Sequence, residues 1–309
     1  MSTGDTEPAG QSEGAADTVS PPFSVVIPAH NEEPVIARCL NAIINGVAAQ
    51  DLPEIIVAAN GCTDRTVEIA RETAPSATVL DLPAGSKVIA MNAANTHATV
   101  TPRFFLDADV QCDYRSLLAT AKVLREPGVM AASPRLKMDL RGCDRRVRAY
   151  YRVWRTQPYV QDRLVGSGLF GLSAEGLERI GTIPPTFADD TWVRTRFSYD
   201  ERRNVAQDEN GAEAYFIVTP PRTAADLVRI EARRRIGSEQ VRVLYPSPHN
   251  GRINRPRDLR AALADGASIF DVVIYLGLKA AVLTRYRWNK LRGKSPQWVR
   301  DTKARQTTA

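Results

Sequence analysis

The sequence predicts an α/β fold in which a mostly parallel sheet is flanked by helices. Short apolar runs alternate with segments of helical spacing through the first half of the chain, which is the pattern of βαβ units. Each run is apolar throughout, as expected of strands that are covered on both faces. Polar motifs follow the runs directly, and in parallel sheets ligands bind beyond the carboxyl ends of the strands. We therefore expect these motifs to meet at one edge of the sheet.

The first half of the folded region is expected to alternate strands with helices. Strands are predicted at 23–28, 54–60, 78–82 and 103–110. Helices are predicted at 33–47, 65–72 and 87–99.

The second half is less regular, and its elements are predicted one by one. Further strands are expected at 128–138, 165–173 and 214–220. Further helices are expected at 144–155, from 174 onward, briefly within 187–197, at 223–237 and, as one or two helices, at 257–286. No internal repeat is visible.

The two ends of the chain differ from its middle. Residues 1–22 are rich in small and polar residues, contain acidic but no basic side chains, and are predicted to be a disordered acidic tail. Residues 256–309 are predicted to form a helical, basic extension. A basic end suggests an anionic partner such as a membrane surface or nucleic acid, while a solvated tail explains it equally well; we expect no nucleic acid partner.

Cysteine use and hydropathy indicate a cytoplasmic location. The four cysteines are far apart and form no CxxC pair, which argues against a zinc site or a disulfide framework and fits a reducing compartment. No signal peptide is recognisable. The most apolar stretch, 267–283, is interrupted by Asp271 and Lys279 and is too short to span a bilayer.

Two carboxylates one residue apart, Asp107 and Asp109, end the fourth predicted strand. Such hard oxygen ligands suit Mg²⁺ or Mn²⁺, and a bound metal neutralises the charge that grows on a departing diphosphate. A polar turn at the end of a strand is the alternative interpretation of this motif alone. Lys87 opens the third helix at the same sheet edge, where it could face a phosphate. Asp64 is also suited to capping the second helix.

Five segments in this order resemble the inverting family 2 glycosyltransferases of GT-A fold. They are VVIPAHNEE, IIVAANGCTDRT, GSKVIAMNAAN, FLDADV and FADDTWVRTRF. The resemblance covers about residues 23–240. It implies a GT-A catalytic domain at 23–255, with a nucleotide-sugar-binding half at 23–112 and an acceptor half at 113–255.

The resemblance also implies roles for individual residues. Asp107 and Asp109 would hold the metal, and the pair Asp189 and Asp190 would contain the catalytic base, with Asp190 the better candidate. Gly166 and Gly168 resemble a glycine-containing segment on the acceptor side, although a bulged strand would also contain them. The nucleotide sugar is expected to contact Pro28, Ala29, Asn31, Glu32, Asn60, Asp64, Lys87, Asp107, Ala108 and Arg235.

A physical argument supports Asp190 independently. An inverting transfer needs one carboxylate to take the proton from the acceptor hydroxyl. Repulsion between adjacent acids, and apolar neighbours such as Phe187 and Trp192, would raise the pKa of one carboxyl group. Capping of a helix by either acid is the structural alternative.

The chain departs from the family pattern at two places. Ala59 stands where members often carry an acid that contacts uracil, so the carrier could be UDP or GDP. Where processive members carry QxxRW, the chain reads EARRRIG, with Arg235 and Ile236 at the positions of the motif arginine and tryptophan. Arg234 and Arg235 could still reach the diphosphate, or could belong to a solvated basic face of the helix. We therefore expect a non-processive enzyme that transfers a hexose or related sugar from a nucleotide-diphosphate donor, with Mn²⁺ or Mg²⁺, to a sugar, lipid-linked or small-molecule acceptor.

Two other functions compete with this one. A nucleotidyltransferase that forms nucleotide sugars would share the sheet and the metal aspartates, but it would open with a glycine-rich basic loop, which PAHNEE is not. A non-enzymatic nucleotide-sugar-binding protein would not need Lys87, Asp107, Asp109 and Asp190 together.

The C-terminal helix raises a separate question. Its apolar side chains at Ile269, Phe270, Val273 and Ile274 share one face and precede a basic cluster. Such a helix can lie on the cytoplasmic face of an anionic membrane or can cover the core of its own domain, and both possibilities stay open.

Overall fold

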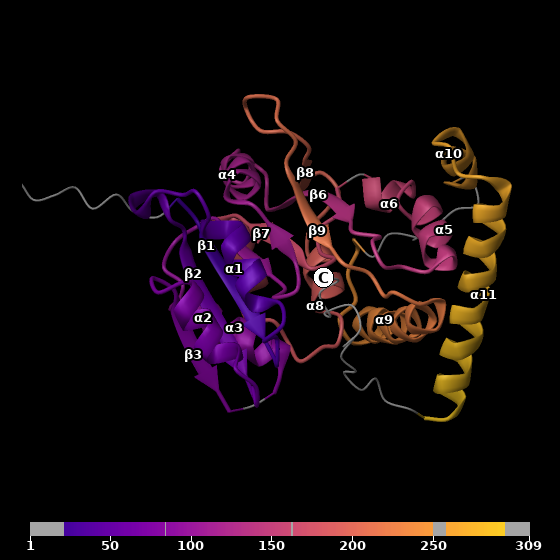
Figure 1. Ribbon diagram of the computed structural model, residues 1–309, viewed down its shortest axis with the longest axis horizontal. Coiled ribbons are helices and arrows are strands. Elements are labelled where there is room, and N and C mark those ends of the chain that lie inside the picture. The colour runs from indigo at the N-terminus through magenta and orange to yellow at the C-terminus, as the bar shows by residue number, and fades with distance from the viewer. Residues whose placement is uncertain (1–21, 84, 162, 250–257, 294–309) are drawn as a thin grey trace, which may run out of the picture.

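A curled nine-stranded sheet runs through the residues that the computed structural model describes, 22–83, 85–161, 163–249 and 258–293 (Figure 1). The strands are β1 (Ser24–Ala29), β2 (Glu54–Asn60), β3 (Thr78–Leu82), β4 (Arg103–Leu106), β5 (Gln111–Cys112), β6 (Ala131–Met138), β7 (Leu169–Leu172), β8 (Arg202–Val205) and β9 (Tyr215–Val218). Their order is β3-β2-β1-β4-β7-β6-β9-β5, and β8 also pairs with β6.

Helices surround this sheet and extend it to one side. They are α1 (Ile36–Ile44), α2 (Thr66–Thr73), α3 (Lys87–His97), α4 (Tyr114–Val123), α5 (Arg145–Trp154), α6 (Pro158–Gln161), α7 (Ala174–Ile180), α8 (Asp189–Arg194), α9 (Ala224–Leu244), α10 (Asp258–Ala264) and α11 (Ile269–Leu291), with a short 3₁₀ helix at Ala49–Asp51. Figure 1 shows α11 at the edge of the molecule farthest from β1–β3. No helix in the described ranges is long and apolar enough to cross a membrane.

The parallel half of the sheet is as predicted. Strand β1 pairs in parallel with β2 and β4, and β2 pairs in parallel with β3. Val25 and Ile27 face one core, which α1, α2 and α4 cover, while Val26 faces a second core beneath α3. Burial on both faces explains why β1 is apolar at every position.

The second half reverses direction. Strand β7 runs antiparallel to both β4 and β6, and β6 then pairs in parallel with β8 and β9. The predicted strands at 128–138, 165–173 and 214–220 are present in shortened form. Strands β5 and β8 were not predicted, because both are short and are stabilised by pairing with distant strands. Helix α4 was not predicted either.

Contacts in the structure explain three of the predicted boundaries that are wrong. Strand β4 ends at Leu106, because the Asp107 N–H donates to the Gly168 carbonyl and the following residues form a turn. Helix α1 begins at Ile36 rather than 33, since residues 32–35 form a turn in which the Val35 N–H donates to the Glu32 carbonyl, and Val35, with non-helical backbone angles, is the N-cap.

Helix α9 does not stop at Gly237 but continues to Leu244. A Cβ at Gly237 would lie 3.2 Å from the Ala188 Cβ, so the glycine allows α8 to approach closely, and it does not terminate the helix. Buried Val241 lies beyond this glycine on the same helix. The tail at 1–21 and the boundary at 255–256 lie outside the described residues.

Helix α11 packs against α5 and α9 through one face only. Asp271 anchors it: its carboxylate accepts from the Ser268 N–H and hydroxyl in a capping box and pairs with Arg152 at 3.1 Å. Tyr275 and Val282 are buried along the same face. Side chains on other sides of the helix are exposed, among them Phe270 at 71% and Leu291 at 83%.

The anchoring of α11 predicts a pH-dependent stability. Burial opposes ionisation of Asp271, but the hydrogen bonds from Ser268 and Arg152 outweigh burial and lower its pKa. A lowered folded-state pKa gives stability that is present above the unfolded value, near 3.9, and is lost as the pH falls through the folded value. Asp271→Ala should therefore lower the free energy of unfolding at pH 7 by about 1–2 kcal/mol.

Urea unfolding of wild type and Asp271→Ala between pH 7 and pH 3 checks this prediction. The difference between the two proteins should shrink toward the acid end. Asp265→Ala, which removes an exposed pair with Arg155, is the matched control and should change stability by less than about 0.5 kcal/mol. Equal effects of the two substitutions at pH 7 would refute the anchoring role.

Candidate active site

A large cleft opens at the carboxyl ends of β1, β2 and β4. Its volume is about 2000 Å³, larger than the roughly 300–1,000 Å³ of common small-molecule pockets. Pro28, Asn60 and Asp107 lie on the sheet side, and residues of α8, α9 and α11 form the opposite side. The cleft is therefore large enough for two substrates next to each other.

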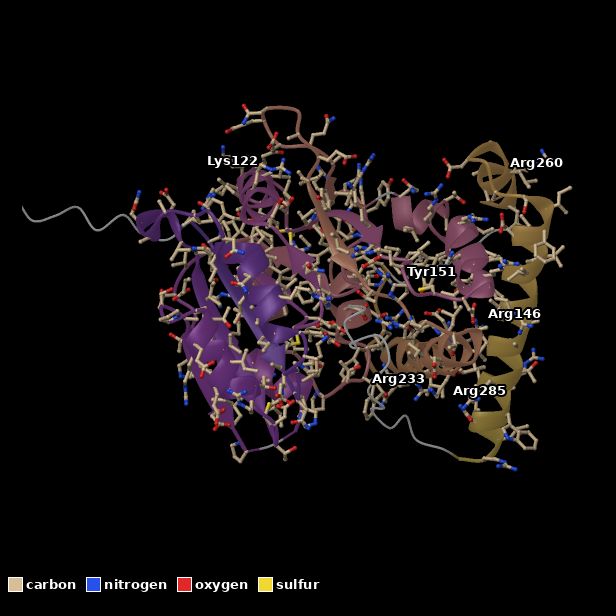
Figure 2. All side chains as sticks on the ribbon, in the orientation of Figure 1. Lys122, Arg146, Tyr151, Arg233, Arg260 and Arg285 are labelled. Carbon is tan, nitrogen blue, oxygen red and sulfur yellow. The ribbon has the colours of Figure 1, made fainter. Side chains whose placement is uncertain are left out.

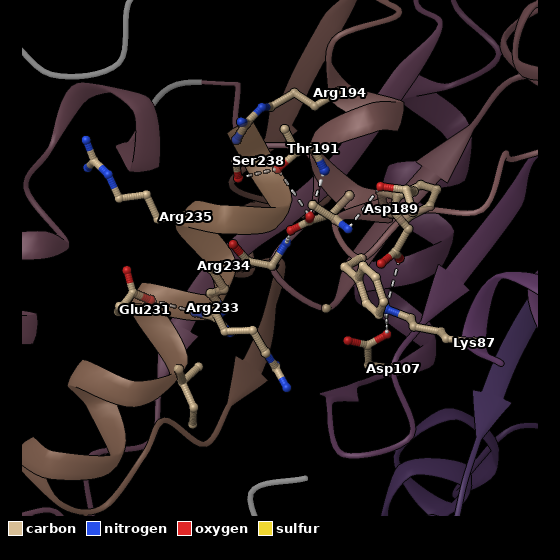
Figure 3. A pocket seen from close by; sticks show the side chains of 18 of the residues that line it. Lys87, Asp107, Asp189, Thr191, Arg194, Glu231, Arg233, Arg234, Arg235 and Ser238 are labelled. Carbon is tan, nitrogen blue, oxygen red and sulfur yellow. Dashed lines mark hydrogen bonds and ion pairs between the residues drawn. The ribbon is translucent and has the colours of Figure 1, made fainter. Parts of the chain in front are cut away.

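Lys87 joins the two sides of the cleft. It is the first residue of α3, where the Ser86 hydroxyl caps the helix by accepting from the Ile89 N–H. Its ammonium group lies 2.7 Å from Asp107 Oδ1 and 2.9 Å from Asp189 Oδ2 (Figure 3). Asp107 follows β4 and Asp189 begins α8, so one cation holds the two halves of the chain together.

Several carboxylates, but one lysine, contribute charge around Asp107. Burial raises the pKa of Asp107 and of Asp189, and Lys87 opposes this effect for both. The neighbouring charges of Asp109 and Asp190 raise the pKa of Asp107 further. The two paired carboxylates in turn raise the pKa of Lys87 against the effect of its burial.

A divalent cation fits these residues chemically. Asp107 and Asp109 present two carboxylates from one turn beside the cleft, and their mutual repulsion is what a cation would relieve. In the described ranges no cluster of three or more His, Cys, Asp or Glu side chains could hold a metal by itself. Magnesium-type sites commonly complete their ligand set with substrate phosphates and water, which this open cleft can admit.

The glycine segment 166–168 lies next to both the Asp107–Asp109 turn and Asp190. A Cβ at Gly166 would lie 2.9 Å from the Asp190 Cβ, and a Cβ at Gly168 would lie 2.6 Å from Val110 and 3.7 Å from Asp107 Oδ2. Both glycines have positive φ, 116° and 103°. Only residues without a side chain allow Asp107 and Asp190 to approach the same loop so closely.

Asp190 is held differently from Asp189. Its Oδ1 accepts from the Thr191 N–H at 2.6 Å, and its Oδ2 faces the Ser167 N–H at 3.4 Å. The helix-capping alternative is wrong, because Ala188 occupies the N-cap position of α8 and no side chain caps the helix, although both acids lie in its first turn. Asp190 thus lines the cleft with Oδ2 directed toward the glycine segment.

The sequence argument about a raised pKa is wrong for Asp190 and right for Asp189. Burial acts to raise the pKa of Asp190, but the charges of Arg194, Lys87 and Arg234 outweigh it, and the pKa is lowered. Asp190 is therefore ionised at neutral pH and able to accept a proton. The sequence argument could not include these cations because two of them come from distant segments.

The expected nucleotide pocket is built by a network between the first two strand ends. The Asn60 side-chain amide donates to the Ala29 carbonyl at 2.7 Å, and the Asn60 carbonyl contacts His30. Asn31, with a φ of 53°, accepts from the Thr63 N–H at 2.7 Å. These bonds hold the loops after β1 and β2 together. Pro28, His30, Glu32 and Asn60 line the cleft at this place.

Asp64 has the capping function that the sequence suggested, although Arg65 occupies the N-cap position of α2. Asp64 Oδ1 accepts from the Thr66 N–H at 3.1 Å, and Oδ2 accepts from the Glu33 N–H at 3.2 Å. Its role in the described structure is to connect the loops after β1 and β2.

Most of the residues expected at the site line the cleft. These are Pro28, Glu32, Asn60, Lys87, Asp107, Ala108, Asp109, Gly168, Asp189, Asp190 and Arg235. Ala29, Asn31, Asp64 and Gly166 do not line the cleft, and the contacts described above connect them with the neighbouring loops. The binding and catalytic roles of all these residues stay predictions.

Sequence reasoning did not identify Arg194, Arg233 and Arg242 as residues of the cleft. Arg194 ends α8, and Arg233 and Arg242 line the cleft from α9 together with Arg234. Arg234 and Arg235, in the run EARRRIG, were considered only as ligands of the diphosphate or as part of a solvated helix face. Recurrence of Glu231, Arg235, Ser238 and Arg242 at helical spacing was an available signal, because it places them on one face of α9.

Comparisons with known proteins agree with the expected family and fold. Residues 24–172 match the family model described as Glycosyl transferase family 2. A stretch of 52 residues is 48% identical to the probable glycosyltransferase YdaM of Bacillus subtilis and covers 17% of this chain and 12% of that protein. The match therefore spans only a small part of the curated relative's length.

The fold is similar to two solved glycosyltransferase structures. One is mannosyltransferase PcManGT from Pyrobaculum calidifontis, in complex with GDP-Man and Mn²⁺ (TM-score 0.55, 21% identity, 91% of this chain and 88% of that chain). The other is glucosyl-3-phosphoglycerate synthase from Mycobacterium tuberculosis (TM-score 0.50, 18% identity, 74% of this chain and 82% of that chain).

The described residues have the GT-A fold of these glycosyltransferases. Residues 24–172, which match the family model of glycosyl transferase family 2, contain the turn with Asp107 and Asp109 and the glycine segment. The expected fold class is confirmed, and the family match agrees with the expected family.

The glycine segment generates a direct prediction. Gly166→Ala should displace Asp190, because the added methyl group would meet its side chain at 2.9 Å. A misplacement of about 1 Å can cost on the order of 10²-fold in rate, so kcat of sugar transfer should fall by about that factor. Steady-state kinetics together with thermal unfolding measure the effect.

Gly211→Ala is the matched control. Gly211 also has a positive φ, 79°, but its added Cβ would have no neighbour within 4 Å. It should show the backbone strain, about 1 kcal/mol, without the loss of rate. Equal rates for both variants would contradict the packing of Gly166 against Asp190.

Proposed function

We propose that the protein transfers a hexose or related sugar from a nucleotide-diphosphate donor to an acceptor hydroxyl, with inversion at the anomeric carbon. One observation carries the proposal: the Asp107–Asp109 turn, Lys87 and an ionised Asp190 lie around one cleft that is large enough for two substrates. The transfer is non-processive, and cell-surface glycans, glycolipids or secondary metabolites are its product classes.

The residues divide the reaction between the two sides of the cleft. Asp190 accepts the proton of the acceptor hydroxyl as the oxygen attacks the anomeric carbon from the face opposite the diphosphate. The bond from the anomeric carbon to the diphosphate oxygen breaks in the same step, and the electron pair leaves with the nucleoside diphosphate. A single displacement of this kind inverts the anomeric configuration.

The donor side supplies charge for the leaving group. Asp107 and Asp109 would hold a divalent cation, Mn²⁺ or Mg²⁺, which neutralises charge on the departing diphosphate when bound. Lys87 adds a cation at the same place and keeps Asp189 directed away from the acceptor. The neighbours solved with GDP-Man or with UDP-Glc and Mn²⁺ support a donor of this class.

Removal of the base tests the proposal. Asp190→Asn should lower kcat by about 10²–10⁴-fold with little change in KM for the donor, since the residue acts on the acceptor. The measurement is release of nucleoside diphosphate from GDP-mannose and UDP-glucose in the presence of Mn²⁺.

Asp189→Asn is the comparison variant. Because Asp189 is paired with Lys87, its loss should reduce thermal stability and donor binding more than the chemical step. If Asp189→Asn were to lower kcat more than Asp190→Asn, with donor KM unchanged, the assignment of the base would be wrong.

We also propose that the enzyme is cytoplasmic and attaches peripherally to an anionic membrane through α11. The exposed faces of the helix carry Ile269, Phe270, Val273, Trp288 and Leu291, and its one acid, Asp271, is buried. Basic side chains gather at this end of the molecule, as Arg146 on α5, Arg260 on α10 and Arg285 on α11 show (Figure 2). Each basic residue near an anionic surface adds about 1 kcal/mol of attraction.

Vesicle co-sedimentation tests the attachment. The protein should bind vesicles of phosphatidylglycerol and phosphatidylcholine, release with salt, and ignore pure phosphatidylcholine. Trp288→Ser with Leu291→Ser should abolish binding, whereas the control Val243→Ser, an exposed apolar residue on α9, should not. Absence of wild-type binding at low salt would leave α11 only its packing role against α5 and α9.

A further inference from the structure

His30 places a polar ring in the cleft that the proposed function does not use. The residue follows β1 directly, lines the cleft and is half-buried. Its Nδ1 lies 2.5 Å from the main-chain carbonyl oxygen of Asn60, the last residue of β2. A Cβ at Gly85, in the loop before α3, would lie 3.6 Å from its Cε1. The ring is therefore held at the sheet edge where β1 and β2 end.

The contact with Asn60 determines the tautomer of His30. A carbonyl oxygen can only accept a hydrogen bond, so Nδ1 carries the ring proton and donates it to Asn60. In a neutral imidazole with this tautomer, the second nitrogen, Nε2, bears a lone pair and acts as an acceptor. His30 therefore presents an acceptor at Nε2 to a ligand in this part of the cleft.

The main chain on both sides of His30 is fixed. The Ala29 carbonyl accepts from the Asn60 side-chain amide at 2.7 Å. Asn31 has a φ of 53°, and its Oδ1 accepts from the Thr63 N–H at 2.7 Å. A side chain held from both neighbours can discriminate between ligands, because moving it to suit another hydrogen-bond pattern would disturb these bonds.

The distance of His30 from the Asp107–Asp109 turn indicates which part of the donor it meets. In the proposed function this turn, which follows β4, receives the diphosphate. With the sheet order β2-β1-β4 and a strand spacing of about 4.8 Å, the end of β2 is about 10 Å from the end of β4. On the other side of β4, the glycine segment that precedes β7 and Asp190 form the acceptor side. The base, which the ribose separates from the diphosphate, is therefore expected at His30.

Neighbouring side chains offer less to distinguish one base from another. Ala59 is completely buried and has no polar side-chain atom. Pro28 has no N–H, and the Asn60 side-chain amide already donates to main-chain carbonyls. Glu32 lines the cleft and has a carboxylate, which makes it the alternative acceptor at this place.

We propose that His30 selects the nucleobase of the donor by accepting, at Nε2, a hydrogen bond from a ring N–H of the base. Uracil carries such a hydrogen at N3 and guanine at N1, whereas cytosine and adenine have a lone pair at the same ring position. A lone pair facing Nε2 repels it, so the site should disfavour CDP and ADP. This inference rests on the proposed function and names the residue that determines its donor.

Calorimetric titration with two pairs of nucleoside diphosphates tests the proposal, because the members of each pair are nearly equal in size. The full chain is titrated with UDP and CDP, and with GDP and ADP, in the presence of Mn²⁺. In at least one pair the member with the ring N–H should bind about tenfold more tightly, as gain of one hydrogen bond and relief of one repulsion provide. A preference in the first pair indicates a UDP donor, and in the second a GDP donor.

Substitution of His30 separates its acceptor from other sources of preference. His30→Phe keeps a flat ring but loses Nε2, so it should weaken the preferred nucleotide and reduce the preference to about threefold or less. His30→Leu should have the same effect and carries the test if His30→Phe folds poorly. His97→Phe, at an exposed position at the end of α3, is the matched control and should keep the full preference. Retained Mn²⁺-dependent binding of the disfavoured nucleotide shows that the variants fold.

Two outcomes would overturn the proposal. One is an equal or reversed affinity of the wild-type protein within both pairs. The other is a preference that survives in both His30 variants, which would assign the contact to another acceptor such as Glu32. In either case, intact Mn²⁺-dependent binding would leave the proposed function standing. If none of the four nucleotides bound to the wild-type protein, the proposed function itself would be contradicted, and this inference with it.

Discussion

The arrangement of the site depends on the two ion pairs of Lys87. They connect the turn after β4 with the first residue of α8. Asp107 and Asp189 are 82 positions apart in the sequence (189 minus 107). Without this cation, Asp107 and Asp189 would repel each other across the cleft, together with their neighbours Asp109 and Asp190. The lysine thus sets the distance between the donor side and the acceptor side.

The glycine segment positions the carboxylates of the two sides, and the arginines determine the charge around Asp190. Gly166 and Gly168 let the segment contact both Asp190 and the turn around Asp107, so both carboxylates are positioned by one loop. On the donor side, acids exceed bases and a cation is favoured. At Asp190, the charges of Arg194, Lys87 and Arg234 outweigh the effect of burial, lower the pKa and keep the carboxylate ionised. The same cleft therefore provides a place for a metal-bound diphosphate and a base that is ready to accept a proton.

The sequence predicted the parallel half of the fold well, because strands buried on both faces carry a strong apolar signal. It also predicted a cleft at their carboxyl ends, and most of the site residues that it named line this cleft, but it did not foresee most of the lining from α8, α9 and α11. It failed where distant contacts decide: β5 and β8 depend on their partners, Gly237 serves helix packing, and the pKa of Asp190 depends on Arg194 and Arg234. The two readings of the C-terminal helix were not exclusive, since α11 buries one face and exposes others.

Calorimetric titration of nucleotide in the presence and absence of Mn²⁺ tests the central claim most directly, because the claim is that the Asp107–Asp109 turn receives a metal-bound diphosphate. Mn²⁺ should tighten binding of GDP or UDP to the wild-type protein by about tenfold or more, the strength of one charged contact. Asp109→Asn should lose this gain, while Asp81→Asn, at an exposed position on β3, should keep it. A Mn²⁺-dependent gain that survives in Asp109→Asn would contradict the account.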